Sequence, residues 1–168
     1  NLIYTPFGEL EQQQWLNAGW RSEGVRVLAW ALGHIALPGA TEMSHFDPTA
    51  QALGFLKDRA ETALADPTLR SHAELSAYGK TAFMVNWRLR NFAENPHTFD
   101  FKLIAQQLPF LGDLEGIELL DGDLRVGDVP LTHVTRTQLI TTMSAAMERH
   151  RAINWLLCET PLYSMVNV

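Results

Sequence analysis

The fold is decided by residues Trp20–Ile35, which read Trp-Arg-Ser-Glu-Gly-Val-Arg-Val-Leu-Ala-Trp-Ala-Leu-Gly-His-Ile. Val25, Leu28 and Leu32 fall on one face of a helix with 3.6 residues per turn, and Trp30 adds a second apolar face beside it. A helix that is apolar around most of its circumference is usually a central one. The sequence therefore predicts a central helix here, ended by Pro38.

Three charged residues, Arg21, Glu23 and Arg26, interrupt this apolar helix. A buried charge must be paired, because moving an unpaired charge out of water costs on the order of several kcal/mol. Glu23 and Arg26 are three residues apart and could pair along the helix. Two interpretations stay open, a structural ion pair with another helix and a polar functional site built on this one.

Two further long helices are predicted. Ser71–Glu94 begins with a capping box, since Glu74 follows Ser71 by three residues, and its apolar residues recur at helical spacing. Thr135–Leu157 carries a similar stripe that includes His150. The remaining predicted elements are a surface helix at Glu9–Asn17, a helix at Thr49–Ala65 capped by Asp47, a short helix within Phe99–Leu111, and strands at Ile117–Leu120, Leu124–Val126 and Val129–Leu131. We therefore expect a mainly α fold with a minor β part: one domain over residues 1–168, with three long helices and one small β-hairpin near residues 117–131.

Composition limits the classes of partner. The formal net charge is −6, which disfavours a nucleic-acid backbone or an anionic membrane. No apolar run has the roughly 20 residues that a membrane helix needs, and no signal peptide is visible. The single cysteine, Cys158, excludes an intramolecular disulfide and is expected to be a small buried residue. These features favour a cytoplasmic protein; the oligomeric state is left open.

The motif search returns no catalytic signature. No Gly-rich phosphate loop, nucleophile elbow or His-Glu-x-x-His helix occurs. The histidines are scattered without metal-ligand spacing, so we expect no metal and no cofactor. His150 lies on an apolar helical face, where a hydrogen-bonded core or boundary histidine is more common than a ligand. Asp121–Gly127 departs from the calcium-loop pattern at its fifth and sixth positions, which are Arg125 and Val126.

Acidic residues cluster around the predicted hairpin. Six of them, against the one base Arg125, are Asp113, Glu115, Glu118, Asp121, Asp123 and Asp128. A solvated hairpin whose turns favour Asp would explain the cluster. The alternative is an electrostatic docking surface for a basic protein partner, which would raise the association rate more than the affinity.

Three stretches together resemble an uncharacterised family, the domain-of-unknown-function family four-two-seven-two. They are Trp20–Gly33, the aromatic helix around Trp87–Arg90, and Glu148–Leu156 with the sequence Glu-Arg-His-Arg-Ala-Ile-Asn-Trp-Leu. The resemblance implies a small, largely helical domain and brings no activity with it.

The charges within the first and third stretches suggest one contact. If the two helices pack together, a Glu23–Arg149 or Arg21–Glu148 network could fix their register, with Arg151 as a further member. We expect this network to be structural, and replacement of Glu23 by alanine to lower the melting temperature.

Two functions are compatible with these observations. The first is a non-enzymatic, acidic interaction protein of the adaptor or toxin-neutralising type. The alternative is an enzyme or small-molecule-binding domain whose pocket lies between helices and is lined by Trp30, Trp87, Trp155 and the Arg/Glu network. A deep pocket with convergent polar groups of shifted pKa would favour the second function.

Overall fold

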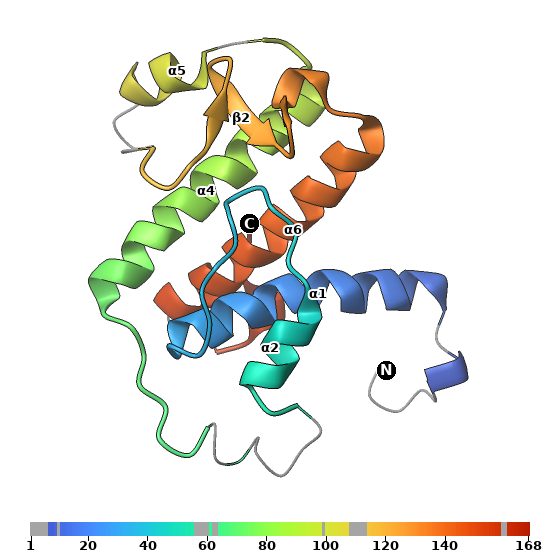
Figure 1. The fold of residues 1–168 in the computed structure, drawn as a ribbon, viewed down its shortest axis with the longest axis vertical. Coiled ribbons are helices and arrows are strands. Elements are labelled where there is room, and N and C mark those ends of the chain that lie inside the picture. The colour runs from blue at the N-terminus through green and yellow to red at the C-terminus, as the bar shows by residue number, and fades with distance from the viewer. Residues whose placement is uncertain are drawn as a thin grey trace.

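The computed structural model describes residues 7–9, 11–55, 61, 64–98, 100–107, 114–158 and 161–168. Its framework is three long helices, α1 (Gln12–Ala31), α4 (His72–Glu94) and α6 (Arg136–Leu157). Helices α4 and α6 lie side by side and run in opposite directions, and α1 crosses the second half of α6 (Figure 1). The expected mainly α architecture with a minor β part is confirmed.

The shorter elements lie around these three helices (Figure 1). They are α2 (Phe46–Ala52), α5 (Phe101–Gln107), the strands β1 (Leu119–Leu120), β2 (Asp123–Val126) and β3 (Val129–Pro130), and 3-10 helices at Phe7–Glu9, Leu131–His133 and Tyr163–Met165. The predicted hairpin is an antiparallel sheet in the order β1-β2-β3, with Leu120 opposite Asp123 and Val126 opposite Val129. Pro130 ends the edge strand β3, where its missing N–H is tolerated.

Local sequence sets the starts of the long helices. Ser71 accepts a hydrogen bond from the backbone of Glu74, and the Glu74 side chain accepts one from the backbone of Ser71. Thr135 and Gln138 form the same reciprocal pair at the start of α6. Because each pair satisfies donors that a helix start leaves open, these boundaries follow from the sequence.

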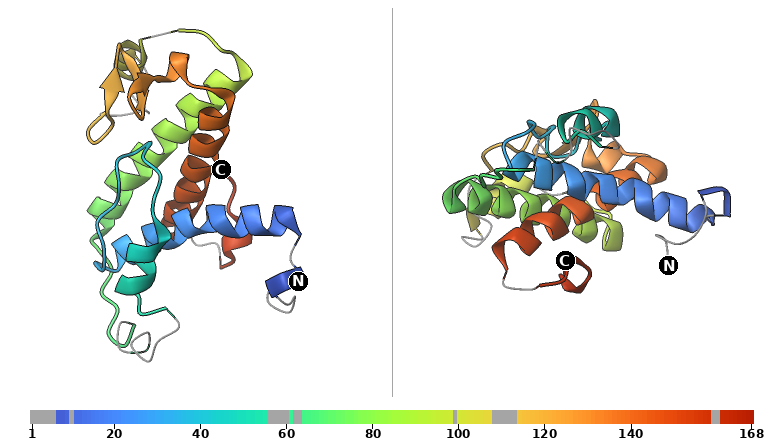
Figure 2. Two further views of the ribbon diagram at one scale, coloured as in Figure 1. Left: turned by 45° about the vertical axis from the view of Figure 1, so that its right-hand side comes forward. Right: turned by 90° about the horizontal axis from the view of Figure 1, so that it is seen from below.

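Helix α1 joins two predicted segments and differs from its prediction in two ways. It is continuous from Gln12, so the helical segments at residues 9–17 and 20–35, whose continuity through Gly19 the sequence left open, are one helix. It ends at Ala31, because Gly33 adopts φ +78°, a left-handed conformation that terminates helices. Its first half extends beyond the α4–α6 pair (Figure 2) and leaves Trp15 and Leu16 exposed. Only the second half is therefore central.

Helix α2 covers the start of the helix predicted at residues 49–65, for which a break at Gly54 was one alternative. It begins after His45, so Asp47 lies in its first turn and does not cap it. It ends at Ala52, and Gly54 follows with φ +63°. The later part of the predicted helix at residues 49–65 falls largely outside the described residues.

The core consists of two clusters along the α4–α6 pair. Where α1 crosses α6, the buried members are Val27, Ala31, Leu75, Ala82, Ala152 and Ile153. Beneath the sheet they are Met84, Val85, Leu89, Phe101, Ile117, Leu124, Val126, Leu131 and Ala146. The predicted apolar stripes of α4 and α6 supply Leu75, Ala82 and Ile153 to the first cluster and Val85, Leu89 and Ala146 to the second.

The single cysteine and the hydrophobicity of the helices were also predicted from the sequence. Cys158, expected to be buried, is exposed, because α6 ends at Leu157 and Cys158 is its C-cap. Among the described residues, no helix combines the length and apolar character needed to cross a membrane.

Candidate functional site

A buried ion pair joins α1 to α6. The Arg149 guanidinium donates from Nε and Nη2 to Oε2 of Glu23, at 2.9 and 2.7 Å. The Glu23 and Arg149 side chains are only 2% and 4% exposed. This is the interhelical contact predicted from the sequence, and it replaces the expected pairing of Glu23 with Arg26.

The same pair holds the loop between α1 and α2. Glu23 accepts hydrogen bonds from the backbone N–H and the hydroxyl of Ser44, at 2.9 and 2.7 Å. Arg149 also donates to the backbone carbonyls of Gly39, Ala40 and Glu42. Every oxygen of the carboxylate and several donors of the guanidinium are thus used within the protein, which is how a buried charge pair becomes tolerable.

Two more residues adjoin this network, and one of them, Arg26, keeps its Nε buried without a hydrogen-bond partner. Arg26 donates to the carbonyls of Ala36 and His45 and to the Thr49 hydroxyl, at 3.2 to 3.3 Å, and so ties the other end of the loop to α1. Burial raises the pKa of Tyr78 to about 12, with Arg149 opposing this shift and Glu23 adding to it. The phenol therefore stays neutral beside the ion pair.

Glu148 pairs within α6 and with the C-terminal segment. It forms an ion pair with Arg151, and its Oε2 accepts a hydrogen bond of 3.2 Å from the Tyr163 hydroxyl. Burial, followed by the charge of Glu148, raises the pKa of Tyr163. Gly24 leaves room for this hydroxyl, since a Cβ there would collide with it. The predicted Arg21–Glu148 contact is wrong, and Arg21 is exposed.

A second buried ion pair corrects the predicted acidic surface. Asp123, 2% exposed, accepts hydrogen bonds at 2.8 and 2.6 Å from Arg88, which is 0% exposed. Asp123 was expected to face a partner, but it anchors β2 to α4. The sequence did not indicate that Arg88 is buried, because its counter-charge, Asp123, is distant in the sequence.

The other acidic residues are arranged unevenly. Glu118 and Asp128 both lie 3.3 Å from the Arg125 guanidinium. Asp121 and Glu115 are exposed. Asp113 lies outside the described residues. The described acidic surface is thus smaller, and closer to neutral, than composition indicated.

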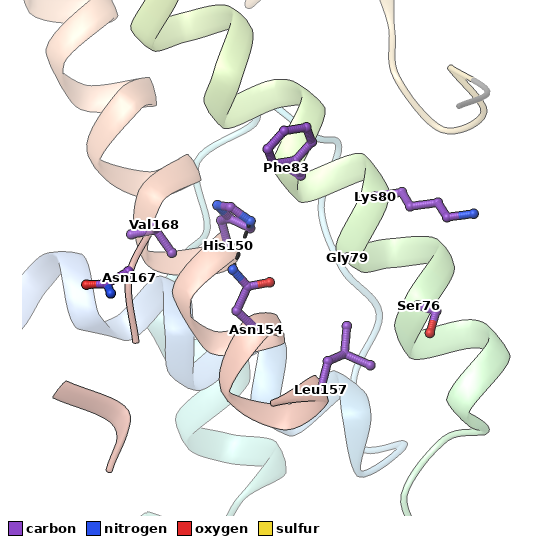
Figure 3. Close-up of a pocket in the computed structure, with 9 residues that line it drawn as sticks. All are labelled: Ser76, Gly79, Lys80, Phe83, His150, Asn154, Leu157, Asn167 and Val168. Atoms are coloured by element: carbon purple, nitrogen blue, oxygen red, sulfur yellow. Dashed lines mark hydrogen bonds between the residues drawn. The ribbon is translucent and has the colours of Figure 1, made fainter. Parts of the chain in front are cut away.

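An open groove of about 590 Å³ lies between α4 and α6 (Figure 3). It is lined by Ser76, Gly79, Lys80, Phe83, His150, Asn154, Leu157, Asn167 and Val168. Phe83 lies across from His150, Leu157 borders the groove on α6, and the Lys80 ammonium points away from His150. This volume falls within the roughly 300–1,000 Å³ range typical of ligand pockets.

His150 lies at the inner wall of this groove between two amides. Its Nδ1 is 3.2 Å from the Asn86 side-chain nitrogen, and its Nε2 is 3.0 Å from the Asn154 side-chain nitrogen. Burial, and secondarily the positive charge of Arg90, lowers its pKa. A neutral imidazole has one donor and one acceptor nitrogen, so one of the two amides must present its oxygen to the ring.

The polar atoms of Asn86 are not all satisfied. Asn86 is 3% exposed, and its Oδ1 is buried without a hydrogen-bond partner. If the amide turned to place its oxygen on His150, its NH₂ group would take the unpaired position instead. In either orientation Asn86 keeps an unused polar atom next to His150, and such an atom is costly unless a ligand or water meets it.

A narrower hollow of about 260 Å³ continues from the groove. It is lined by Phe83, Asn86, Trp87, Arg90, Asn91, Glu94, His150 and Val168, so three residues border both hollows. Arg90 donates to the Val168 carbonyl at 2.9 Å. The wider hollow is mainly apolar, whereas the narrower one is rich in polar side chains. We call the two together the α4–α6 groove.

The pocket predicted from the tryptophans is only partly correct. Trp87 lines the narrower hollow, and its ring lies 6.3 Å from that of Phe101. Trp30 packs on Tyr78 at 5.0 Å and Trp155 on Tyr163 at 6.0 Å, and neither lines the groove. The Arg/Glu network also lies elsewhere.

The residues that sequence reasoning missed are Asn86 and Asn154. Asn86 lies three residues from both Phe83 and Leu89, on the buried side of α4, and an amide in such a position was the available signal. Asn154 follows His150 by four residues and so shares its helical face. Among the described residues, no three His, Cys, Asp or Glu side chains come together as a metal site requires.

Comparisons with known proteins identify the family. A family model described as Domain of unknown function (DUF4272) matches residues 6–105, more than half of the chain, and confirms the family expected from the resemblance. The match contains the first two resembling stretches, while Glu148–Leu156 lies beyond it. No curated protein and no solved structure matches the chain.

Proposed function

Because the chain belongs to the DUF4272 family, whose description names no activity, we propose a function from the geometry alone: it is a small-molecule-binding domain whose site is the α4–α6 groove. The observation that carries this proposal is the group formed by His150, Asn86 and Asn154 at the wall of this open, mainly apolar groove. An apolar cavity with a few converging polar groups is the usual form of a ligand site.

The geometry favours binding over catalysis. Both ring nitrogens of His150 are engaged by amides, so neither is free to take a proton from a substrate. Ser76, a hydroxyl on the groove wall, lies 3.3 Å from His72 Nδ1 in an exposed pair. Among the described residues no hydrogen bond links a carboxylate to the His72 ring, so a nucleophilic triad would lack its orienting third member here.

The buried ion pairs are not available to a ligand, which also favours the α4–α6 groove as the binding site. Glu23 with Arg149, and Arg88 with Asp123, are buried and directed at each other. Their hydrogen bonds are spent on loops and strands of the protein itself. They therefore position the helices that form the groove and offer little to a ligand.

The acidic interaction protein remains a separate proposal with less support. Glu118, Asp121 and Asp128 are exposed on the hairpins, which suits docking of a basic partner. However, Arg125 lies between Glu118 and Asp128, and Asp123 is buried. An adaptor or toxin-neutralising role would have to rely on a smaller surface than the sequence indicated.

A fragment screen followed by two-dimensional NMR tests the binding proposal. We expect fragments that bind to perturb the amide resonances of Ser76–Phe83 and His150–Leu157 together. Ser76→Trp places an indole in the wider hollow and should abolish these perturbations, whereas Ser76→Ala, the matched control, should retain them. A library that perturbs no groove residue, or hits unaffected by Ser76→Trp, would contradict the proposal.

A further inference from the structure

The lining of the narrower hollow specifies a ligand chemistry more closely than its volume does. Its charged residues are Arg90 and Glu94, one of each sign, and Arg90 already donates to the Val168 carbonyl. The remaining polar groups are the two amides Asn86 and Asn91 and the imidazole of His150. A wall of opposite charges and uncharged polar groups gives no net attraction for an ion, and it suits a neutral head with both donors and acceptors.

Asn86 supplies an unmet hydrogen bond within this wall. Its Oδ1 is buried and has no partner, although the other end of the same amide contacts His150 at 3.2 Å. Asn91 accepts a 3.5 Å contact from Arg88, which leaves its NH₂ group as the end that can donate. The two amides therefore offer a carbonyl oxygen and N–H donors within one hollow.

The wider hollow specifies the rest of the ligand. Phe83 and Leu157 give it an apolar wall, and Gly79 adds no side chain that would narrow it. Phe83, His150 and Val168 border both hollows, so one molecule can extend from the apolar part into the polar part. An aromatic or aliphatic body in the wider hollow would bury apolar surface, and its polar head would reach the amides.

We propose, building on the proposed function, that the α4–α6 groove binds neutral carboxamides: an apolar body lies on Phe83 and Leu157, and a planar amide head pairs with Asn86. A carboxamide carries an adjacent donor and acceptor, so it satisfies the Asn86 amide whichever of its atoms faces the hollow. A carboxylate offers acceptors only and an ammonium offers donors only. Since Oδ1 is buried, side chains bordering the hollow move aside when the head enters.

Three probes of one shape test this ligand class on the whole chain. They are 3-phenylpropionamide, 3-phenylpropionate and 3-phenylpropylamine, which share a phenyl body and differ in the charge of the head. We expect the amide to bind about tenfold more tightly than either ion, the factor that one ordinary hydrogen bond supplies. It should also shift the side-chain NH₂ resonances of Asn86 in the native chain, a readout that needs no substitution.

Asn86→Leu, close to asparagine in size, should remove the preference for the amide probe. Asn17→Leu, on the exposed part of α1, is the matched control and should keep it. Equal binding of the three probes, binding of none of them, or an unchanged preference in a folded Asn86→Leu variant would overturn the carboxamide assignment. If fragments of other chemistry still perturb the groove, only the ligand class fails; if none does, the proposed function fails with it.

Discussion

Two polar clusters meet on α6 at adjacent residues, and they differ in completeness. Arg149 turns toward α1, where its guanidinium donates to Glu23 and to three loop carbonyls. The Glu23 carboxylate also accepts a hydrogen bond from Ser44. His150 turns toward α4, where it contacts two amides beside an open hollow and Asn86 keeps an unpaired atom. In the first cluster both carboxylate oxygens of Glu23 are used by the protein, whereas the second is uncharged, bordered by open space and leaves an amide atom of Asn86 unpaired.

This contrast distinguishes the polar groups that hold the fold together from those that we propose to meet a ligand. A buried charge left without a partner would destabilise the fold strongly, so a charged cluster must be completed by the protein itself. An unpaired amide atom costs less, about 1–3 kcal/mol, and a ligand can recover that cost on binding. The following predictions therefore expect stability to respond mainly at Arg149 and binding mainly at His150.

The largest effect is expected for Glu23→Ala. It leaves Arg149 buried without its counter-charge, which typically costs about 3–5 kcal/mol in the free energy of unfolding. For a chain of this size about 2–4 °C of melting temperature corresponds to each kcal/mol, so the melting temperature should fall by roughly 6–20 °C. Thermal unfolding followed by circular dichroism measures this, with exposed Glu118→Ala as control. An unchanged melting temperature would show that the Glu23–Arg149 pair is not structural.

A double replacement sharpens the same comparison. Glu23→Leu with Arg149→Met removes both charges and keeps apolar volume in the space between α1 and α6. Since the pair no longer has to be desolvated, the double variant should be more stable than Glu23→Ala, recovering about half or more of the lost free energy. Denaturant titration of the native chain, both single variants and the double variant gives the coupling energy. A double variant as unstable as the sum of the singles would mean that the loop carbonyls, and not the counter-charge, need Arg149.

At the second cluster the expected effect depends on pH. Burial keeps the folded-state pKa of His150 below its ordinary value of 6.5, so below that value the unfolded chain takes up the proton first. The free energy of unfolding should therefore fall as pH decreases from 6.5 toward the lower native pKa. Above pH 6.5 it should stay constant. Melting temperatures of the native chain and His150→Gln at pH values of about 7.5 and 5.5 measure the difference. Equal losses in both proteins would contradict a buried neutral His150.

The sequence predicted elements whose signals are local. Ser71 with Glu74 marks the start of α4 within four residues, and helical spacing places Leu75 and Leu89 in the core. The Glu23–Arg149 pair spans 126 residues, and it could be predicted because two stretches of family-like sequence carried the charges together. This long-range pair was therefore predicted from the charged residues that the two stretches contain, and not from helical periodicity.

The α4–α6 groove was not predictable in the same way. Asn86 and Asn154 are uncharged, and each is equally at home on a surface, so neither stands out until α4 and α6 are packed together. Asp123 shows the converse error. Its position after Asp121-Gly122 resembles an ordinary polar turn, and only the register of β2 turns its carboxylate inward onto Arg88. An aspartate next to a turn looks the same in the sequence whether its side chain is exposed in the turn or buried in an ion pair.

The smallest effect is expected on the acidic hairpins, where Glu118→Gln, Asp121→Asn and Asp128→Asn are combined. These side chains are exposed, and surface substitutions usually change stability by less than about 0.5 kcal/mol each. Asn tolerates the φ of +53° at Asp121, so the backbone there can keep its conformation. Asp123→Asn, by contrast, should lower the melting temperature by several degrees, since it removes the charge that Arg88 faces.

This separation decides how acidic docking must be tested. A variant that includes Asp123 would lose stability as well as surface charge, so a lost partner could not be assigned to the surface, whereas the triple variant changes charge and leaves the fold intact. A basic protein retained by the native chain at low salt and released by the folded triple variant would support docking at the hairpins. Equal retention by both would remove the hairpins as a docking surface. The buried charges at Glu23 and Asp123 would keep their structural role, and the α4–α6 groove would remain the proposed binding site.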